Sequence, residues 1–199
     1  MRTCRFLLVT LAVTVALIVH GCPEAIAGVS KTNEITGSEE FVFPGFSVGA
    51  AQAKHRVAYI WSHECSDCRE QFGRDVLKIY LSAASKEKFT FVFLEYEEKQ
   101  KTVDTYTIPA LCGGREFYQW YVLGFLANNL TMQQTRELAA KKGTAYKGCP
   151  DKLLVGNVLK TYFAKMKKLH PEITTTAGTL VLDGKVISST REIEEALSD

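Results

Sequence analysis

The fold is decided by the stretch WSHECSDCREQFG, residues 61–73, together with the apolar run VAYIW, residues 57–61. The apolar run predicts a buried strand, which leads into Cys65 and Cys68 at the start of a helical pattern. Partial positive charge at a helix N-terminus stabilises a thiolate, and two intervening residues leave the two sulfurs within bonding reach. We therefore expect a redox pair, with Cys65 as the exposed attacking thiol and Cys68 as the more buried resolving thiol.

Two cysteines at this spacing also occur in inert cores and in metal sites. One alternative is a thiolate module for zinc built from Cys65, Cys68, Cys112 and Cys149, or a copper-handling pair. Zinc sites normally use a second close pair, whereas Cys112 and Cys149 lie far apart in sequence, which weakens this alternative. The strand-to-helix context favours redox chemistry.

The chain has 199 residues, of which 46% are hydrophobic and 23% charged. This composition is enough for one domain with a core of its own. A net charge of +2 gives no indication of a nucleic-acid partner.

The first 27 residues have the pattern of a signal peptide. Arg2 and Arg5 precede an apolar stretch over residues 6–19, which is too short for a comfortable membrane span. Cleavage after Ala27 would leave a polar segment, residues 28–40, which we expect to be a flexible leader. The segment predicts export to the periplasm or cell envelope.

A second way of processing the N-terminus stays open. Residues 19–22 resemble a bacterial lipobox, in which Cys22 would be lipidated and would anchor the protein. His20 is unusual in that motif, so we favour the unanchored form. In either case an oxidising compartment favours disulfides. Cys112 and Cys149 are then a possible structural disulfide, although four cysteines allow three connectivities.

Periodicity and turn signals order the rest of the chain. We expect Asp183-Gly184 to turn a hairpin, residues 97–107 to be turn-like and Pro109 to lie in a turn. The expected strands are 41–48 at an edge, 56–61, 89–96, 179–182 and 185–188; the expected helices are 72–85, 115–128, 132–142, 151–170 and a last one after Ser189.

This order resembles the thioredoxin fold as elaborated in the DsbA-like family of exported thiol–disulfide oxidoreductases. The resemblance covers residues 41–199 and rests on the motifs IWSHECSDC (60–68) with Phe72, FYQW (117–120) and GTLVLDGK (178–185). It implies an α/β fold with a central mixed sheet, helices on both faces and a helical insert at about 113–171. It also implies an enzyme that exchanges disulfides with protein thiols through Cys65 and Cys68.

The same resemblance implies no cofactor and no metal. The partners it implies are cysteine-containing protein substrates and a membrane or soluble redox partner that resets the pair. The implied active-site loops contain His63, Ser66, Asp67, Gly178 and Thr179.

Gly178 is a departure from the family, which has a cis-proline at the head of this strand. A cis bond without proline costs about 2.5–4 kcal/mol, so we expect a trans peptide and a differently shaped loop. This departure puts ordinary substrate handling in question. It supports a further alternative, a non-catalytic interaction protein on the thioredoxin fold.

Asp67 is a second distinguishing feature. A carboxylate inside the loop disfavours a neighbouring thiolate, which predicts a less oxidising pair than the strongest oxidants of the family. A charged His63 would act in the opposite direction, but we expect His63 to be a solvated surface residue.

Overall fold

The computed structural model describes residues 44–50, 52–86, 89–149 and 151–196. The predicted signal peptide, the leader, Cys22 and the first three residues of the predicted edge strand lie outside this range. Within it, no helix is both long and apolar enough to cross a bilayer.

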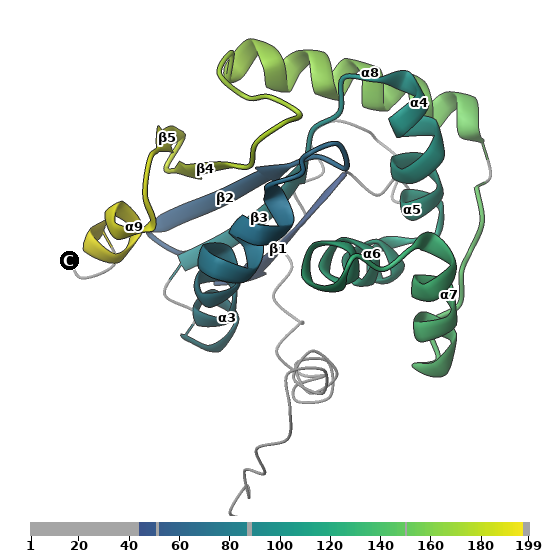
Figure 1. The fold of residues 1–199 in the computed structure, drawn as a ribbon, viewed down its shortest axis with the longest axis horizontal. Coiled ribbons are helices and arrows are strands. Elements are labelled where there is room, and N and C mark those ends of the chain that lie inside the picture. Colours follow the sequence, from purple (N-terminus) through teal and green to yellow (C-terminus); the bar gives the residue numbers. More distant parts are fainter. Residues whose placement is uncertain (1–43, 51, 87–88, 150, 197–199) are drawn as a thin grey trace, which may run out of the picture.

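A mixed sheet forms the centre of the described chain (Figure 1). Its strand order is β1-β3-β2-β4-β5, so the first strand lies at an edge, as predicted. The β2–β3 pair is parallel, whereas the other three pairs are antiparallel. The strands are β1 (Gly45–Gly49), β2 (His55–Trp61), β3 (Phe89–Glu95), β4 (Thr179–Leu182) and β5 (Lys185–Ile187).

The parallel pair decides where the loops meet. Trp61 at the end of β2 lies opposite Glu95 at the end of β3, so both strands leave the sheet at the same edge. Thr179, the first residue of β4, pairs with Ile60 and enters the sheet at that edge. Three segments that are distant in sequence therefore converge there.

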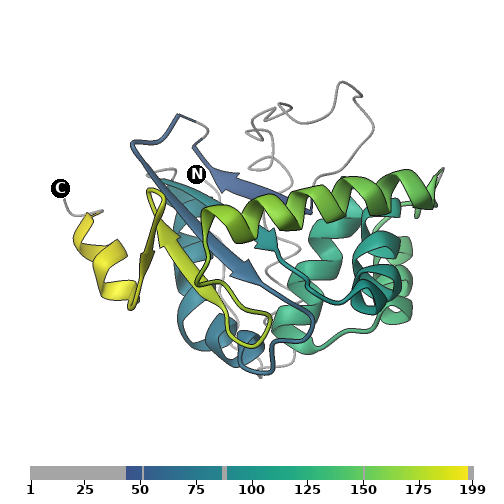
Figure 2. The ribbon, with the colours of Figure 1, turned by 90° about the horizontal axis from the view of Figure 1, so that it is seen from above.

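One continuous helical run follows β2 and packs on the sheet. It comprises α2 (Cys68–Gln71), a π-helical segment η1 (Phe72–Val76) and α3 (Leu77–Lys86). The ring of Phe93 contacts those of Phe72 and Tyr80, with centroids 6.0 and 5.5 Å apart. Figures 1 and 2 place α3 on one face of the sheet and α8 on the other.

The helices between β3 and β4 begin earlier than predicted. Residues 97–107 are not a turn, and the insert starts at Gln100 instead of near 113. Pro109 lies in the first turn of α5, where its missing N–H is not needed, and the wider π turns of η2 directly precede it. The elements are α4 (Gln100–Thr102), η2 (Val103–Thr107), α5 (Ile108–Cys112), α6 (Arg115–Asn128), α7 (Met132–Lys141) and α8 (Lys152–Leu169).

Local signals correctly placed several other boundaries. Thr131 and Gln134 form a capping box at the start of α7. Asp183 and Gly184 both have positive φ, 48° and 83°, as the two-residue turn between β4 and β5 requires. The Asp183 carboxylate also accepts the backbone N–H of Arg56, which ties the hairpin to β2. A last helix, α9 (Thr190–Ala196), follows β5.

A disulfide joins Cys112 at the end of α5 to Cys149 ahead of α8, with Cα atoms 4.5 Å apart. The bridge closes a loop of 37 residues that contains α6 and α7. Closing such a loop removes conformational entropy from the unfolded chain.

We predict that the double variant Cys112→Ser/Cys149→Ser loses about 4 kcal/mol of unfolding free energy, because a loop of this length is released. Urea unfolding followed by tryptophan fluorescence measures the change. The matched control is Cys65→Ser/Cys68→Ser, which opens a loop of only three residues and should lose about half as much. If the first variant unfolds at the same urea concentration as the wild type, the bridge does not form in solution.

Candidate active site

Cys65 and Cys68 are joined by a disulfide at the edge of the sheet where β2 ends, with Cα atoms 5.3 Å apart. Helix α2 begins at Cys68, and Cys65 lies in the turn before it, where its N–H donates to the carbonyl of Ser62 at 3.3 Å. The disulfide therefore lies directly ahead of the free N–H groups of the helical run, where partial positive charge would stabilise a thiolate.

The predicted exposure of Cys65 is wrong for the disulfide form. Cys65 is 3% exposed and Cys68 is fully buried. Both cysteines belong to the hydrophobic core, whereas Ser66 and Asp67 between them are exposed. The Ser66 hydroxyl donates to the Asp67 carboxylate at 2.8 Å. The exposed part of the redox loop is thus the dipeptide between the two cysteines.

Tyr59 connects β2 to the helix that starts at Cys68. Its hydroxyl contacts the Cys68 carbonyl at 3.0 Å and the Gln71 side-chain oxygen at 3.2 Å. Burial raises the pKa of the Tyr59 phenol, and the nearby Asp75 adds to the effect. The hydroxyl therefore remains a hydrogen-bond donor throughout the physiological pH range.

Gly178 lies against this tyrosine. A Cβ at position 178 would overlap the Gln71 side-chain oxygen and would come within 2.7 Å of Tyr59 Cε2. The described residues contain no cis peptide bond, so the expectation of a trans loop is confirmed. Thr179 follows as the first residue of β4.

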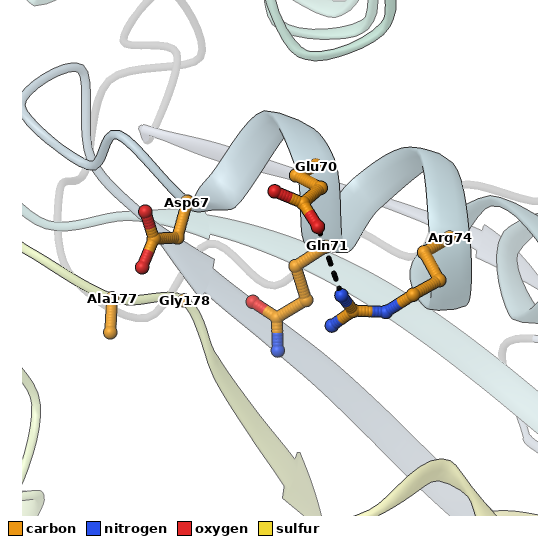
Figure 3. A pocket seen from close by; sticks show the side chains of 6 residues that line it. All are labelled: Asp67, Glu70, Gln71, Arg74, Ala177 and Gly178. Carbon is orange, nitrogen blue, oxygen red and sulfur yellow. Dashed lines mark hydrogen bonds and ion pairs between the residues drawn. The ribbon is translucent and has the colours of Figure 1, made fainter.

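A depression of about 260 Å³ lies between the helix and this loop. In Figure 3, the Asp67 and Gln71 side chains face the Ala177–Gly178 segment, and Glu70 and Arg74 pair with each other farther along the helix. Asp67, Glu70 and Arg74 give these walls a net charge of −1. The depression begins at Asp67, the second of the two residues between Cys65 and Cys68.

His63 is buried, which contradicts the expectation of a surface residue. Its side chain is 2% exposed, because two buried carboxylates and a tyrosine surround it. Nδ1 lies 3.2 Å from Glu95 and 3.0 Å from Glu97, and Nε2 lies 2.8 Å from the Tyr121 hydroxyl.

Both carboxylates receive further hydrogen bonds. Glu95 accepts from the hydroxyls of Tyr118, at 2.7 Å, and Thr107. Glu97 accepts from the Ser62 hydroxyl at 2.8 Å and from the backbone N–H of His63 at 2.6 Å. We call His63, Glu95 and Glu97 the buried ionic cluster.

The cluster favours a charged imidazole. Burial of His63 lowers its pKa, because a buried charge loses its hydration. The carboxylates of Glu95 and Glu97 have the opposite and larger combined effect, and the pKa of His63 rises to about 9. Burial also raises the pKa of Glu97, and the hydrogen bonds and charge of His63 offset part of that rise. His63 is therefore an imidazolium at neutral pH.

Sequence reasoning missed Tyr59, Gln71, Glu95 and Glu97. A signal for the two glutamates was present, since Glu95 is the last residue of a largely apolar strand that runs parallel to β2, and Glu97 follows two residues later. The carboxyl ends of parallel neighbours share one sheet edge, so acidic residues there lie beside the loop that follows β2. Tyr59 and Gln71 had no comparable signal.

Within the described residues the four cysteines are paired in two disulfides, so the four thiolates of the zinc site considered above are not free. The group in the described residues with the spacing of metal ligands is the buried ionic cluster, whose nitrogen and oxygen atoms lie within 4.8 Å of one another. Those atoms already form hydrogen bonds with protein groups.

These features define a thioredoxin fold with a helical insert between β3 and β4 and a disulfide at the β2–α2 junction. Solved DsbA-like structures have the same fold. *Chlamydia trachomatis* DsbA is 15% identical, with a TM-score of 0.55 over 85% of this chain and 95% of that one. No protein-family model matches the sequence, and no curated protein matches it significantly.

Two further structures show the same likeness. The thiol-disulfide exchange protein α-DsbA2 of *Wolbachia pipientis* is 10% identical, with a TM-score of 0.56 over 76% of this chain and 84% of its own. The catalytic domain of *Proteus mirabilis* ScsC is 10% identical, with a TM-score of 0.52 over 83% and 93% of the two chains. At these identities the likeness establishes the fold.

We predict that Gly178→Ala destabilises the protein by about 1–3 kcal/mol, because the new methyl group displaces Tyr59 or Gln71. Gly73→Ala is the matched control, since its Cβ would meet no atom within 4 Å, and a helical alanine should stabilise by up to about 1 kcal/mol. Chemical denaturation measures both changes. Equal effects from the two variants would contradict the close packing at Gly178.

We also predict that stability falls as the pH rises from 6.5 to 9.5. The raised pKa of His63, about 9 against an ordinary 6.5, contributes stability that is complete below pH 6.5 and is lost as the pH passes through 9. This loss amounts to about 3 kcal/mol. Urea unfolding across this range should show the loss in the wild type and in His55→Gln, but not in His63→Gln. A wild-type profile that is flat to pH 9.5 would contradict a charged buried imidazole.

Proposed function

We propose that this protein is an exported thiol–disulfide oxidoreductase that exchanges disulfides with the thiols of other proteins. The observation that supports the proposal most is the Cys65–Cys68 disulfide directly ahead of a helix N-terminus, at the loop-bearing edge of a DsbA-like fold. The disulfide itself carries the two electrons, so the reaction needs no organic cofactor.

The exchange proceeds in two displacements. A substrate thiolate attacks the Cys65 sulfur, the Cys65–Cys68 bond breaks, and Cys68 leaves as a thiolate that takes up a proton. A second substrate thiolate then attacks the substrate sulfur of the mixed disulfide, and Cys65 leaves as a thiolate. The substrate gains a disulfide, and the redox pair gains two electrons; the reverse sequence reduces a substrate disulfide.

The substrate segment next to the reacting cysteine would lie in the depression between Asp67 and the Ala177–Gly178 loop (Figure 3). Its net negative walls favour a segment that carries a basic residue. Because Cys65 is 3% exposed, the groups packed around it must shift for an incoming thiolate to reach its sulfur. Chemistry at Cys65 is therefore coupled to local motion at the β2–α2 junction.

The N-terminal sequence supports action in the periplasm or cell envelope, with a lipid anchor through Cys22 as a second form. There, a membrane-bound or soluble redox partner would return the pair to its starting state. An oxidising compartment is also where the Cys112–Cys149 bridge would persist.

We predict that Cys65→Ser no longer catalyses the reduction of insulin by dithiothreitol, because no sulfur remains at the attacked position. Cys68→Ser should instead accumulate a mixed disulfide between Cys65 and its substrate, because the resolving thiol is missing. Non-reducing electrophoresis and mass spectrometry detect the adduct.

The control for both variants is Cys112→Ser/Cys149→Ser, which removes the other disulfide and should keep exchange activity at a temperature where it is folded. Full activity in Cys65→Ser would refute the proposal. A Cys65–Cys68 disulfide that resists mild reductant in the folded protein would favour a non-catalytic interaction protein.

A further inference from the structure

The Glu97 side chain contacts Ser62 and His63, the first two residues after β2. Its carboxylate accepts from the Ser62 hydroxyl at 2.8 Å and from the backbone N–H and Nδ1 of His63 at 2.6 and 3.0 Å. The Ser62 hydroxyl in turn accepts the N–H of Glu64 at 3.0 Å, and the Ser62 carbonyl accepts that of Cys65. One carboxylate from the loop after β3 thus fixes the path of the chain that leads to Cys65.

The His63 ring is held equally firmly. It stacks on Tyr106 and Tyr121, with centroids 4.9 and 5.5 Å apart, and it also contacts the rings of Trp61 and Phe125. Because Nε2 and Nδ1 are both hydrogen-bonded, the imidazole cannot turn without breaking contacts on each side. Its charge is therefore fixed in position relative to the loop.

Stability alone does not call for such a cluster. Burying carboxylates and an imidazolium removes their hydration, and an apolar core of similar volume is often at least as stable. Here Glu95 is the last residue of β3 and Glu97 lies just beyond it, so both carboxylates lie at the edge that carries the redox pair. The placement indicates a role in the chemistry of that edge.

We propose that the Glu97–His63 pair positions Cys65 and couples the ionisation of Cys65 to that of His63. The inference rests on the proposed redox role of Cys65. His63 precedes Cys65 by two residues, so their Cα atoms lie within about 7 Å of each other. Under this proposal the His63 imidazolium and the Cys65 thiolate each stabilise the charged form of the other, and linkage makes the two pKa shifts equal.

The other charges around the pair determine the balance. His63 faces Glu95 from β3, Glu97 from the loop after it, Tyr106 from η2 and Tyr121 from α6. Near Cys65 the loop carries the carboxylates of Asp67 and of Glu64, which pairs with Lys99 at 2.8 Å. His63 is the cationic group within residues 62–67.

The first test uses the wild-type protein. Nuclear magnetic resonance follows the His63 ring through a pH titration, once with the disulfide intact and once after reduction. The pKa of His63 should rise by about one unit on reduction, because the Cys65 thiolate adds negative charge nearby. The signals of His55 and His170 appear in the same spectra and serve as controls, since their titration curves should be the same before and after reduction. A change in the His63 pKa below about 0.2 units would overturn the coupling.

The second test compares Glu97→Gln with Glu98→Gln. Glu98 is the adjacent residue and contacts Tyr96 and Lys167 instead of the redox loop. Glu97→Gln should slow exchange about tenfold or more, since small misplacements of a reacting group are costly. It should also reduce the shift in the His63 pKa on reduction, which a purely structural role would leave intact. Glu98→Gln should match the wild type in both measurements.

The outcomes separate this inference from the proposed function. If exchange depends on Cys65 but the pKa of His63 is the same before and after reduction, the coupling is refuted and the proposed oxidoreductase function stands. A His63 shift in a protein without exchange activity supports the coupling and refutes the enzyme. If Glu97→Gln does not fold, the wild-type titration decides. Tight binding of added zinc chloride that is lost in His63→Gln would make the cluster a metal site and would also overturn the inference.

Discussion

Because β2 and β3 are parallel neighbours at the centre of the sheet, the residues that follow both strands meet at one edge. The loop with Cys65 comes from β2, and Glu95 and Glu97 come from β3. The antiparallel β4 begins at the same edge and brings Gly178. Buried apolar side chains fix this register, since a slip of one residue would turn each strand's core face outward. Packing of the core thus assembles the candidate active site.

Tyr59 explains why a glycine occupies position 178. Its phenol reaches the Cys68 carbonyl and the Gln71 amide, and it fills the space that a Cβ at position 178 would need. A proline has a Cβ as well, so the residue expected from the DsbA-like resemblance would not fit beside this tyrosine. The glycine at this position is therefore matched to the packing of Tyr59 and Gln71, which leaves no room for a Cβ. It leaves the Ala177–Gly178 segment in place beside the redox pair.

The sequence predicted those parts of the fold that short-range signals determine. Apolar runs located the strands, Asp183-Gly184 located the hairpin, and Thr131 with Gln134 located the start of α7. The helical run before Cys112 was missed, because its charged residues and Pro109 have the composition of a turn. Burial of His63 could not be predicted, since its partner Glu97 lies 34 residues away and periodicity carries no information about such pairs.

The charged groups near Cys65 affect its thiolate to different extents, because water reaches some of them and not others. Asp67 is exposed, so water and salt weaken its repulsion of a thiolate. His63 is enclosed by aromatic rings and protein donors, where a charge acts through a lower effective dielectric constant. The buried carboxylates of Glu95 and Glu97 hold His63 charged, yet their own negative charge offsets part of its effect on Cys65. An estimate of the redox potential from the Ser66-Asp67 dipeptide alone is therefore incomplete. Under the coupling proposed above, the stability of the thiolate depends on the buried cluster as well as on the residues between the two cysteines.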